Sequence, residues 1–330
     1  MPDKTVSHYT ILEKLGEGPT GAVYMARDTK RDRDVALKFL PTRVQLSETD
    51  KARLRQEATH ASLLVHPNIR AFYSLKIEKN ECFAVLEYVD GKTLRDLMPV
   101  ESQQVAINYA ISICAAFQEA HAKGILHRNL RPEGVMVSQK KRVKVLGFGE
   151  APLKEVLKLA RTTGTPEDAA YVSPEQIEGV AVDARSDIFT LGVLLYHMVS
   201  GQLPFRADHE AGMFYAVQNE PPVSIRQYRP DLSPGFVSII ERALEKKPAD
   251  RYRSVNEMLA EFRHLKRASF SISKVFSRPT GTTAKIATQP FRKFQGKKEG
   301  MPIGKMVPLL LGIILLILLA IIGIRAFINP

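Results

Sequence analysis

The spacing of three glycines in an alternating N-terminal segment limits the fold of this chain more than any other feature. Residues 9–40 alternate between apolar and polar side chains as strands do, and Gly16, Gly18 and Gly21 interrupt them. The pattern G-x-G-x-x-G also marks dinucleotide-binding folds, but there a helix follows the glycines. Here residues 22–26 continue as a second strand, so we expect a glycine loop inside a hairpin. Such a loop can approach phosphates closely because no Cβ intervenes, although an ordinary glycine-rich hairpin has the same pattern.

A third strand and a helix are expected next. Residues 35–38 form the strand and end it in a lysine. We predict a helix that begins near Ser47, where Asp50 supplies a partial capping box, and that ends before Pro67. The residues that repeat at helical spacing and should form its apolar face are Leu54, Ala58, Ala61 and Val65.

The second half of the chain has helical periodicity. After two more strands in residues 70–90, a long amphipathic helix is expected over Gln103–Lys123. Its apolar stripe should consist of Val105, Tyr109, Ile113 and Phe117. From there to Phe262 we expect mostly helix, so that the fold class is α+β, with a β-rich part followed by a helical part.

Two short motifs in the helical part resemble those of protein kinases. The run His127-Arg128-Asn129, with Gly134 five residues after Asn129, is similar to the catalytic loop His-Arg-Asp-x-x-x-x-Asn. Gly147-Phe148-Gly149 is similar to the Asp-Phe-Gly motif that follows it. The frame of both motifs is present, but their acidic and metal-binding side chains are replaced.

Further landmarks extend the resemblance over residues 9–262. Val35-Ala36-Leu37-Lys38 is similar to the kinase motif V-A-I-K, and Ser173-Pro174-Glu175 stands where kinases have Ala-Pro-Glu. By the resemblance, Asp187 braces the catalytic loop, and Arg251 pairs with Glu175; these three residues have architectural roles. The chain is identified as a member of the eukaryotic-like Ser/Thr protein kinases of bacteria. The resemblance implies a two-lobe protein-kinase fold in residues 9–264, with a small β-rich N-lobe and a large α-helical C-lobe.

The resemblance also implies an ATP site. By the resemblance, Lys38 holds the α- and β-phosphates of ATP and forms an ion pair with Glu57. Residues 87–89 correspond to the hinge between the lobes, whose backbone groups bind the edge of the adenine ring. The candidate nucleotide-binding residues are Gly16, Gly18, Gly21, Val23, Ala36, Lys38, Glu57, Glu87 and Val89.

Three substitutions argue against phosphoryl transfer. Asn129 replaces the aspartate that accepts the substrate's hydroxyl proton, and Gly134 and Gly147 replace the two metal ligands. Each loss of a preorganised group costs about 10²- to 10³-fold in rate. The three essential positions of the catalytic site are therefore not intact. The motif residues His127 and Arg128 are retained, and Arg131 keeps a positive charge at a position where kinases have lysine. We predict a pseudokinase that binds ATP without tightly bound Mg²⁺.

Alternatives remain for the function. One is an active Ser/Thr kinase with non-standard metal handling, in which Glu133 or Glu150 substitutes for a lost acid. Another is a nucleotide sensor. Thr162 and Thr163 in the activation segment are candidate phosphorylation sites, with ordinary loop threonines as the alternative. The sequence Glu167-Asp168-Ala169 resembles a three-residue insertion before Tyr171 that alters the peptide-substrate platform.

The C-terminal sequence predicts attachment to a membrane. The net charge of +12 is concentrated in residues 263–305, which hold 11 Lys and Arg against Glu299 alone, so the globular part is near neutral and no nucleic-acid partner is expected. Residues 306–324 are uncharged and would span about 28 Å as a helix, close to the roughly 30 Å of a bilayer core. The positive charges before the span place the kinase-like domain in the cytoplasm.

The expected domain order is then complete. It runs from an N-terminal tail (1–8) through the kinase-like domain (9–264), a basic disordered juxtamembrane linker (265–305) and the transmembrane helix (306–324) to a short tail (325–330). The linker has two interpretations, contact with anionic lipid headgroups and a solubilising spacer. Two lone cysteines, Cys82 and Cys114, indicate a reducing compartment and buried thiols. The protein partner is unidentified; another kinase or its substrate is the expectation.

Overall fold

The computed structural model describes residues 4–18, 21–40, 47–78, 81–148 and 165–276. The side chains of residues 57, 78, 81 and 269–276 lie outside this description. The chain divides into two units, Met1–Arg278 and Pro279–Pro330, and the description concerns the first. Thr162, Thr163 and Glu150 lie outside the described residues, as do 277–305 of the predicted linker, the predicted span 306–324 and the short tail 325–330.

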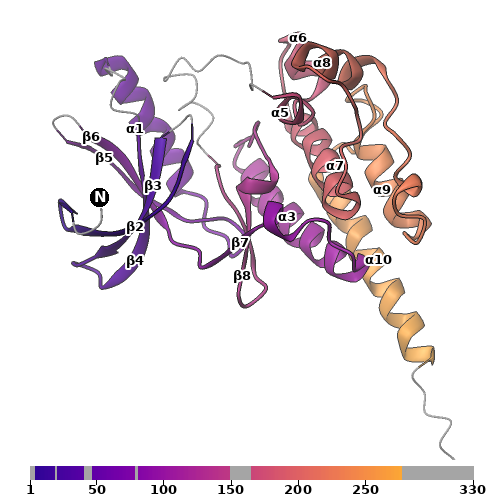
Figure 1. Ribbon diagram of the computed structural model, residues 1–330, viewed down its shortest axis with the longest axis horizontal. Helices are drawn as coiled ribbons and strands as arrows, with labels where there is room; N and C mark the ends of the chain where they lie inside the picture. The colour runs from indigo at the N-terminus through magenta and orange to yellow at the C-terminus, as the bar shows by residue number, and fades with distance from the viewer. Residues whose placement is uncertain (1–3, 19–20, 41–46, 79–80, 149–164, 277–330) are drawn as a thin grey trace, which may run out of the picture. The chain divides into compact units, whose positions relative to one another are not determined.

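A six-stranded antiparallel sheet forms the N-terminal part of the fold (Figure 1). Its strands are β1 (Thr5–Val6), β2 (Tyr9–Gly18), β3 (Gly21–Asp28), β4 (Arg33–Phe39), β5 (Phe72–Glu78) and β6 (Glu81–Glu87), in the order β1-β2-β3-β4-β6-β5. The alternation of the sequence sends every second side chain to one face, where they form a core. This core consists of Val6, Tyr9, Ile11, Ala26, Val35, Leu37, Phe83 and Val85.

The first strand begins earlier than the sequence indicated. Residues 1–8 were expected to be a tail, but Thr5 pairs with Thr10 and Val6 with Tyr9. Val6 is only 7% exposed, since it packs into the core of the sheet. One apolar residue in a polar run carries too little periodicity to predict a strand, and the pairing with β2 is what forms it.

Helix α1 (Glu48–Ser62) follows the sheet's first four strands. Ser47 and Asp50 form the complete capping box, which fixes the start of the helix where the sequence placed it. The predicted apolar face is correct for Leu54 and Ala61, which are buried, but wrong for Val65, which is 83% exposed. The helix ends at Ser62, so Val65 is out of helical phase, and Leu64 is buried in its place.

The C-terminal part of the fold is mainly helical. Its helices are α2 (Leu94–Leu97), α3 (Gln103–Ala122), α5 (Pro166–Ala169), α6 (Pro174–Glu178), α7 (Ala184–Ser200), α8 (Glu210–Asn219), α9 (Pro234–Ala243) and α10 (Val255–Phe276). Two short 3₁₀ helices, η1 (Pro132–Gly134) and η2 (Ile225–Gln227), and a small sheet of β7 (Gly91–Thr93), β8 (Val135–Ser138) and β9 (Val143–Val145) complete it. Helix α7 is the centre of this part, because every residue from Ser186 to Val199 is buried.

The buried stripe of α3 differs from the prediction. Ile113 and Phe117 are fully buried as expected, whereas Val105 is 37% exposed. The helix packs against both α7 and α10, so a broader face is covered than one stripe supplies. That face is filled by Ala106, Ile107, Ala110, Ile113, Cys114, Ala116, Phe117 and Ala120.

The two thiols lie inside the fold. Cys114 is fully buried in α3, and burial raises its pKa to about 12. Cys82 is half-buried in β6, and burial raises its pKa to about 11. Both are free, and neither thiol is activated as a nucleophile, because only the thiolate reacts.

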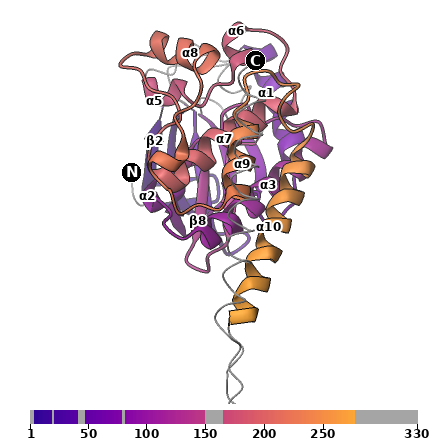
Figure 2. The same ribbon diagram turned by 90° about the vertical axis from the view of Figure 1, so that its right-hand side faces the viewer.

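The last helix extends into the segment predicted to be a linker. Helix α10 continues to Phe276, twelve residues beyond the expected domain end at 264, and Figure 2 shows its final turns extending past the neighbouring helices. The linker prediction is therefore wrong for residues 265–276, which continue the helix, with Leu265 packed on the core. In the part of the chain that the structure describes, no helix combines the length and apolar character that a bilayer crossing needs.

A buried ion pair joins three segments of the helical part. Arg251, 1% exposed, pairs with Glu175 through contacts of 2.7 and 2.9 Å. Its guanidinium also donates to the carbonyls of Arg185, Glu245 and Lys246. Ser186 donates a further hydrogen bond of 2.5 Å to Glu175. Burial alone would raise the pKa of Glu175, but the hydrogen bonds from Arg251 and Ser186 outweigh it and hold that pKa below its usual range.

Replacing Arg251 by methionine should destabilise the fold by about 3–5 kcal/mol, because the Glu175 carboxylate would remain buried without its counter-ion. Urea unfolding at pH 7 measures this loss. The double variant Arg251→Met/Glu175→Gln removes both charges and should recover part of it. A loss below about 1 kcal/mol in the single variant would contradict the assignment.

The same pair predicts a pH dependence. Because the pKa of Glu175 is lower in the folded state, its charge stabilises the fold above the unfolded pKa, about 4.3. That contribution is lost as the pH falls through the folded pKa. The acid limb of the stability profile should therefore be shallower in Glu175→Gln than in the wild type.

Candidate functional site

The register of the N-terminal sheet assembles the predicted nucleotide-binding residues. In β3 and β4, Val23 pairs with Lys38 and Met25 with Ala36; in β6, Ala84 pairs with Lys38. Ala36 is buried and Val23 half-buried in one small apolar cluster that also contains Ala84 and Leu86. Lys38 is only 9% exposed. The strands therefore place one buried ammonium group beside an apolar surface, which suits a ligand with a ring and an anionic end.

The three glycines of the loop differ in the space around them and in whether another residue could replace them. A Cβ at Gly16 or Gly18 would meet no atom within 4 Å, so both lie beside open space. Gly21 has φ +121, and a Cβ there would lie 1.8 Å from the carbonyl oxygen of Phe39. Gly21 is thus required by the close approach of β3 to β4, whereas Gly16 and Gly18 leave backbone accessible to a ligand.

Glu57 is the acidic partner that the resemblance predicts for Lys38. Glu57 is in the middle of α1, but its side chain lies outside the described residues. The Lys38–Glu57 ion pair therefore stays a prediction.

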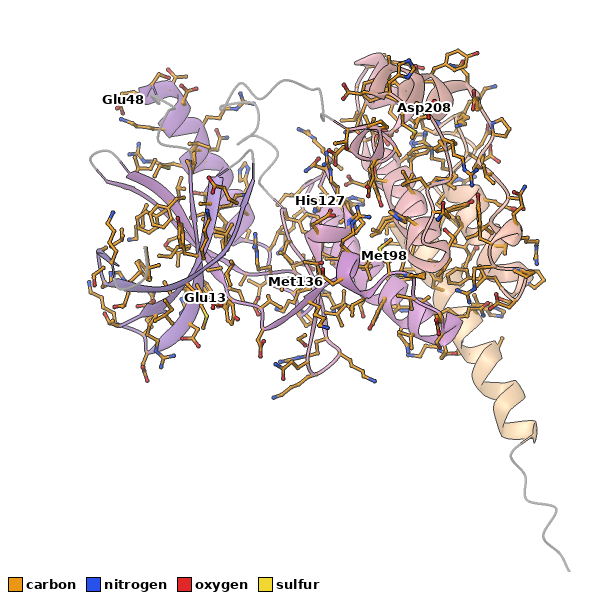
Figure 3. All side chains as sticks on the ribbon, viewed as in Figure 1. Glu13, Glu48, Met98, His127, Met136 and Asp208 are labelled. Carbon is orange, nitrogen blue, oxygen red and sulfur yellow. The ribbon has the colours of Figure 1, made fainter. Side chains whose placement is uncertain are left out.

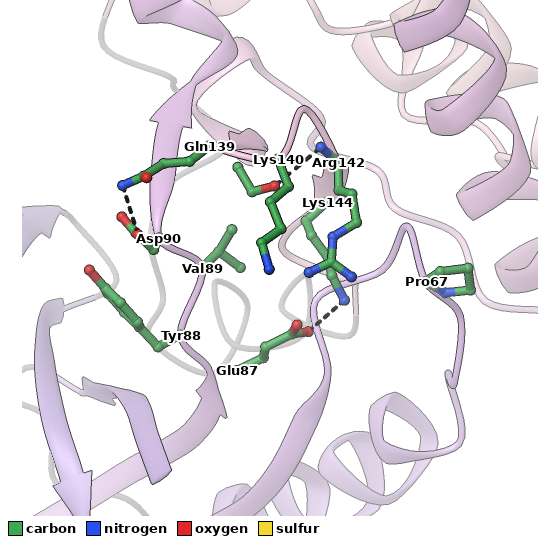
Figure 4. A pocket seen from close by; sticks show the side chains of 10 residues that line it. Pro67, Glu87, Tyr88, Val89, Asp90, Gln139, Lys140, Arg142 and Lys144 are labelled. Atoms are coloured by element: carbon green, nitrogen blue, oxygen red, sulfur yellow. Dashed lines mark hydrogen bonds and ion pairs between the residues drawn. The ribbon is translucent and has the colours of Figure 1, made fainter.

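The predicted hinge contacts a basic hairpin. The Glu87 carboxylate accepts hydrogen bonds from the Ala71 amide (2.9 Å) and from Nζ of Lys144 (2.8 Å). Figure 4 shows this pair and the second pair between Gln139 and Asp90. The side chain of Glu87 is therefore ion-paired with Lys144 of β9, and only the backbone of Glu87 is left for a ligand in the nucleotide site.

A hollow of about 310 Å³ lies beside this hinge. Its lining consists of Pro67, Glu87, Tyr88, Val89, Asp90, Ser138, Gln139, Lys140, Arg142 and Lys144. Among the described residues, neither Lys38 nor a glycine of the loop lines it. The hollow therefore shares Glu87 and Val89 with the predicted nucleotide site but contains none of the residues predicted to hold the phosphates.

The catalytic-loop backbone is fixed by Asp187, from the first turn of α7. Its carboxylate accepts from the amides of His127 (2.9 Å) and Arg128 (2.8 Å), and it contacts Nε2 of His121 at 2.8 Å. Arg128 has φ +61, a conformation that non-glycine residues rarely adopt. Gln176 donates to the Arg128 carbonyl from the other side (3.1 Å). The strained peptide is held because hydrogen bonds reach it from both α6 and α7.

His127 connects the two motifs. This residue, labelled in Figure 3, is 3% exposed, and its ring lies against Phe117 (5.5 Å between centroids) and Phe148 (4.7 Å). Its Nε2 contacts the carbonyl oxygen of Leu146 at 2.7 Å. The loop that carries Asn129 and the segment that carries Gly147 are therefore packed as one unit.

The two glycines at the metal positions offer no side-chain ligand, and Asn129 offers no carboxylate. Asn129 is exposed, and Gly134 lies at the end of η1 with space for a side chain, since a Cβ would meet nothing closer than 3.9 Å. Gly147 has φ +91 and would bring a Cβ within 3.4 Å of the His127 ring. Across the described residues, no group of three His, Cys, Asp or Glu side chains is arranged to bind a metal ion. Within residues 4–148 and 165–276, as far as they are described, the two positions that hold Mg²⁺ in kinases therefore carry no side-chain ligand.

The segment predicted to be a three-residue insertion contacts the catalytic loop. It forms α5, a single turn capped by Thr165, whose hydroxyl accepts from the Asp168 amide (3.1 Å). The Asp168 carboxylate is ion-paired with Arg131 of the catalytic loop. Glu167 is ion-paired with Arg95, which also contacts Glu133 at 2.7 Å. Burial alone would lower the pKa of Arg95, but Glu133 and Glu167 outweigh it and raise that pKa.

Sequence reasoning missed these pairs. It treated Glu167 and Asp168 as an interruption of the substrate platform, Glu133 as a substitute acid, and Arg131 as a remaining charge. The signal in the sequence is Thr165-Pro166 followed by two acids, which is typical of the first turn of a helix. That pattern predicts the turn but does not say which cations it meets.

The comparison with known proteins now decides the family. The model of the protein kinase domain matches residues 9–262, most of the chain. The chain belongs to the protein kinase family. The PknB proteins of Mycobacterium leprae and Mycolicibacterium smegmatis, to which the chain is similar, are Ser/Thr protein kinases.

Three comparisons illustrate the likeness. PknB of Mycobacterium tuberculosis is 35% identical over 272 residues, which is 79% of this chain and 43% of that protein. PknB of Mycolicibacterium smegmatis is 32% identical over 314 residues, covering 92% and 50% respectively. The solved PknI kinase domain of M. tuberculosis superposes with a TM-score of 0.62 at 24% identity, over 80% of this chain and 98% of that one. The chain spans half or less of the length of these curated relatives, and the PknI likeness shows the two-lobe fold alone.

Replacing Asp187 by alanine should destabilise this kinase domain by about 2–4 kcal/mol, because backbone amides of the loop lose a charged acceptor. Hydrogen exchange of the amides of His127 and Arg128 should rise at the same time. Asp183→Ala at the N-cap of the same helix removes an exposed cap and its surface ion pair with Arg185, and should cost about 1 kcal/mol without affecting the loop. Unchanged exchange at the loop in Asp187→Ala would show that the brace is not needed.

Proposed function

We propose that this kinase domain acts as a membrane-tethered pseudokinase, which binds a nucleotide and a protein partner and does not transfer phosphate. The observation that carries the proposal is the pairing of Arg131 with Asp168. The catalytic loop has asparagine in place of its acid, both metal positions are glycine, and one of its two cations, Arg131, is ion-paired within the chain itself. The protein partner, another kinase or a kinase substrate, would recognise a conformation of the lobes.

Phosphoryl transfer places specific demands on a protein. The reaction needs alignment, metal ions and neutralisation of developing charge, and little covalent help from the protein. Asn129 supplies no base, and Gly134 and Gly147 supply no side-chain ligand for a metal ion. Each lost group lowers the rate of phosphoryl transfer by about 10²- to 10³-fold. The three losses are not strictly additive, but even a correction of several decades leaves a negligible rate.

Nucleotide binding is a separate property with its own support. Gly16 and Gly18 lie beside open space, Lys38 is buried in register with Val23, and the apolar cluster around Ala36 is intact. These features favour an adenine nucleotide held by its ring and its first phosphates, without tightly bound Mg²⁺. A nucleotide that shifts the conformation would make the domain a sensor.

The second candidate function is an active Ser/Thr kinase. It is favoured by the intact brace between Asp187 and the catalytic loop and by the names of the curated relatives. In that case a carboxylate outside the usual positions would have to serve as base or ligand. The two candidates differ in one measurable property, transfer of the γ-phosphate.

With radiolabelled ATP, Mg²⁺ or Mn²⁺ and a generic acceptor protein, the full chain should transfer no more label than Lys38→Ala does. The reason is the absence of a base and of metal ligands. Transfer by the wild type that disappears in Lys38→Ala would establish the second candidate instead.

Restoration of the lost groups tests the scaffold itself. The variant carries Asn129→Asp, Gly134→Asn and Gly147→Asp, together with Asp168→Ala to release Arg131. The structure has room at Gly134, whereas the positive φ at Gly147 will cost stability on the order of 1 kcal/mol. The matched control carries alanine at 129, 134 and 147 with the same Asp168→Ala change. Label transfer should appear in the first protein and not in the control; its absence from both would point to a deeper defect in the site.

The membrane tether rests on the sequence of residues 306–324 and the basic run before it. Full-length protein should stay with membranes during alkaline carbonate extraction. Arginine at Leu311, Leu315 and Leu319 should release it, because each charge at the centre of a span costs about 2.5–3.5 kcal/mol on insertion scales. Glutamine at Lys293, Lys297 and Lys298 is the control and should leave it anchored. Release of the wild type by carbonate would refute the span.

Contact of residues 265–305 with anionic lipid headgroups is a separate question. It is tested by comparing how the wild type and the control variant bind anionic and neutral vesicles.

A further inference from the structure

Two sets of ion pairs, adjacent through the consecutive residues Glu167 and Asp168, form a charged group at the catalytic loop. This group, called here the acid clamp, consists of Arg95, Arg131, Glu133, Glu167 and Asp168. Three carboxylates meet two guanidinium groups, so its formal charge is −1. Arg131 and Asp168 are 23% and 24% exposed, so their attraction is screened less than that of an open surface pair.

The acid clamp is built into the fold. Ala169 and Ala170 are fully buried and Tyr171 is 4% exposed, which anchors α5 at its C-terminal end. Thr165 caps the other end, and buried Pro132 fixes the loop directly after Arg131. Thr93 and Asp96 form a capping box that holds α2, the helix of Arg95. The carboxylate of Asp168 is therefore positioned by packing on both sides of the pair.

The position of the acid clamp relates it to one part of a nucleotide. In kinases the residue at position 129 accepts the substrate hydroxyl, and the γ-phosphoryl group must lie in line with that hydroxyl. The γ-phosphate of ATP would therefore end beside residues 129–131. Lys38 would meet the phosphates that ADP and ATP share, whereas the third phosphate would meet a net negative group.

The metal ions that normally offset this repulsion have lost two of their usual side-chain ligands. Metal ions bridge the β- and γ-phosphates in active kinases, but Gly134 and Gly147 offer no ligand for them. The guanidinium of Arg131 is already ion-paired with Asp168. Arg128, the other cation of the loop, is exposed.

We propose that the nucleotide site prefers adenine nucleotides that end at the β-phosphate over ATP, and that Asp168 sets this preference. The inference rests on the proposed nucleotide binding and specifies its ligand class. Like charges within several ångströms of each other at a partly exposed site lower affinity by about tenfold. ADP should therefore bind about ten times more tightly than ATP when no divalent ion is present.

Isothermal titration calorimetry tests this with the full chain in detergent and EDTA, titrated separately with ADP and ATP. In Asp168→Asn the ratio of the two dissociation constants should fall from about ten toward one, because Arg131 is released and the local charge rises. Asp168→Glu keeps the charge and should keep the ratio. Asp208→Asn, an exposed acid remote from the loop in sequence, is the matched control and should also keep it.

Each outcome has one meaning. Wild-type affinity for ATP equal to or above that for ADP overturns the inference, as does a ratio that Asp168→Asn leaves unchanged. Should Asp168→Asn fail to fold, Glu167→Gln makes the same change of charge in the acid clamp, and an unchanged ratio there likewise overturns it. If ADP does not bind at all, the nucleotide-binding part of the proposed function falls as well. Binding of both nucleotides without preference removes only the inference.

Discussion

The Asp187 carboxylate holds the catalytic loop in a backbone conformation that the loop would not adopt alone. Its hydrogen bonds to the amides of His127 and Arg128 offset the strain at φ +61, and they originate from a helix that is buried on all sides. The brace uses none of the groups that transfer phosphate. Architecture and chemistry are therefore carried by different side chains, and the loop keeps its shape after its acid is lost.

Glycine at position 147 affects the stability of the fold as well as its catalytic capacity. At φ +91 a side chain is strained, and here it would also contact the His127 ring. Without a metal ion, a carboxylate at this position would bring strain without a compensating bond. Glycine removes that cost, which agrees with the general trade between stability and activity at strained active-site positions.

The sequence predicted elements well where periodicity or a motif was long. Strands 9–40, the start of α1 at Ser47 and the helical C-terminal part agree with the structure. Errors arose at ends and faces: Val65 lies past the end of α1, Val105 faces away from the broad interface of α3, and α10 continues beyond residue 264. The pairs of Asp168 with Arg131 and of Glu167 with Arg95 bridge segments 37 and 72 residues apart, and no local pattern encodes such contacts.

The continuation of α10 to Phe276 changes the reach of whatever follows. Twelve residues as helix advance the chain by about 18 Å as a rigid rod. The same twelve residues as a flexible coil would contribute only to a fluctuating distance that grows as the square root of length. If the domain is tethered as proposed, a partly rigid stalk would reduce the volume that it explores. Its effective concentration for a neighbour on the same membrane would then depend on how well the length of the stalk matches the height of the neighbour's binding face.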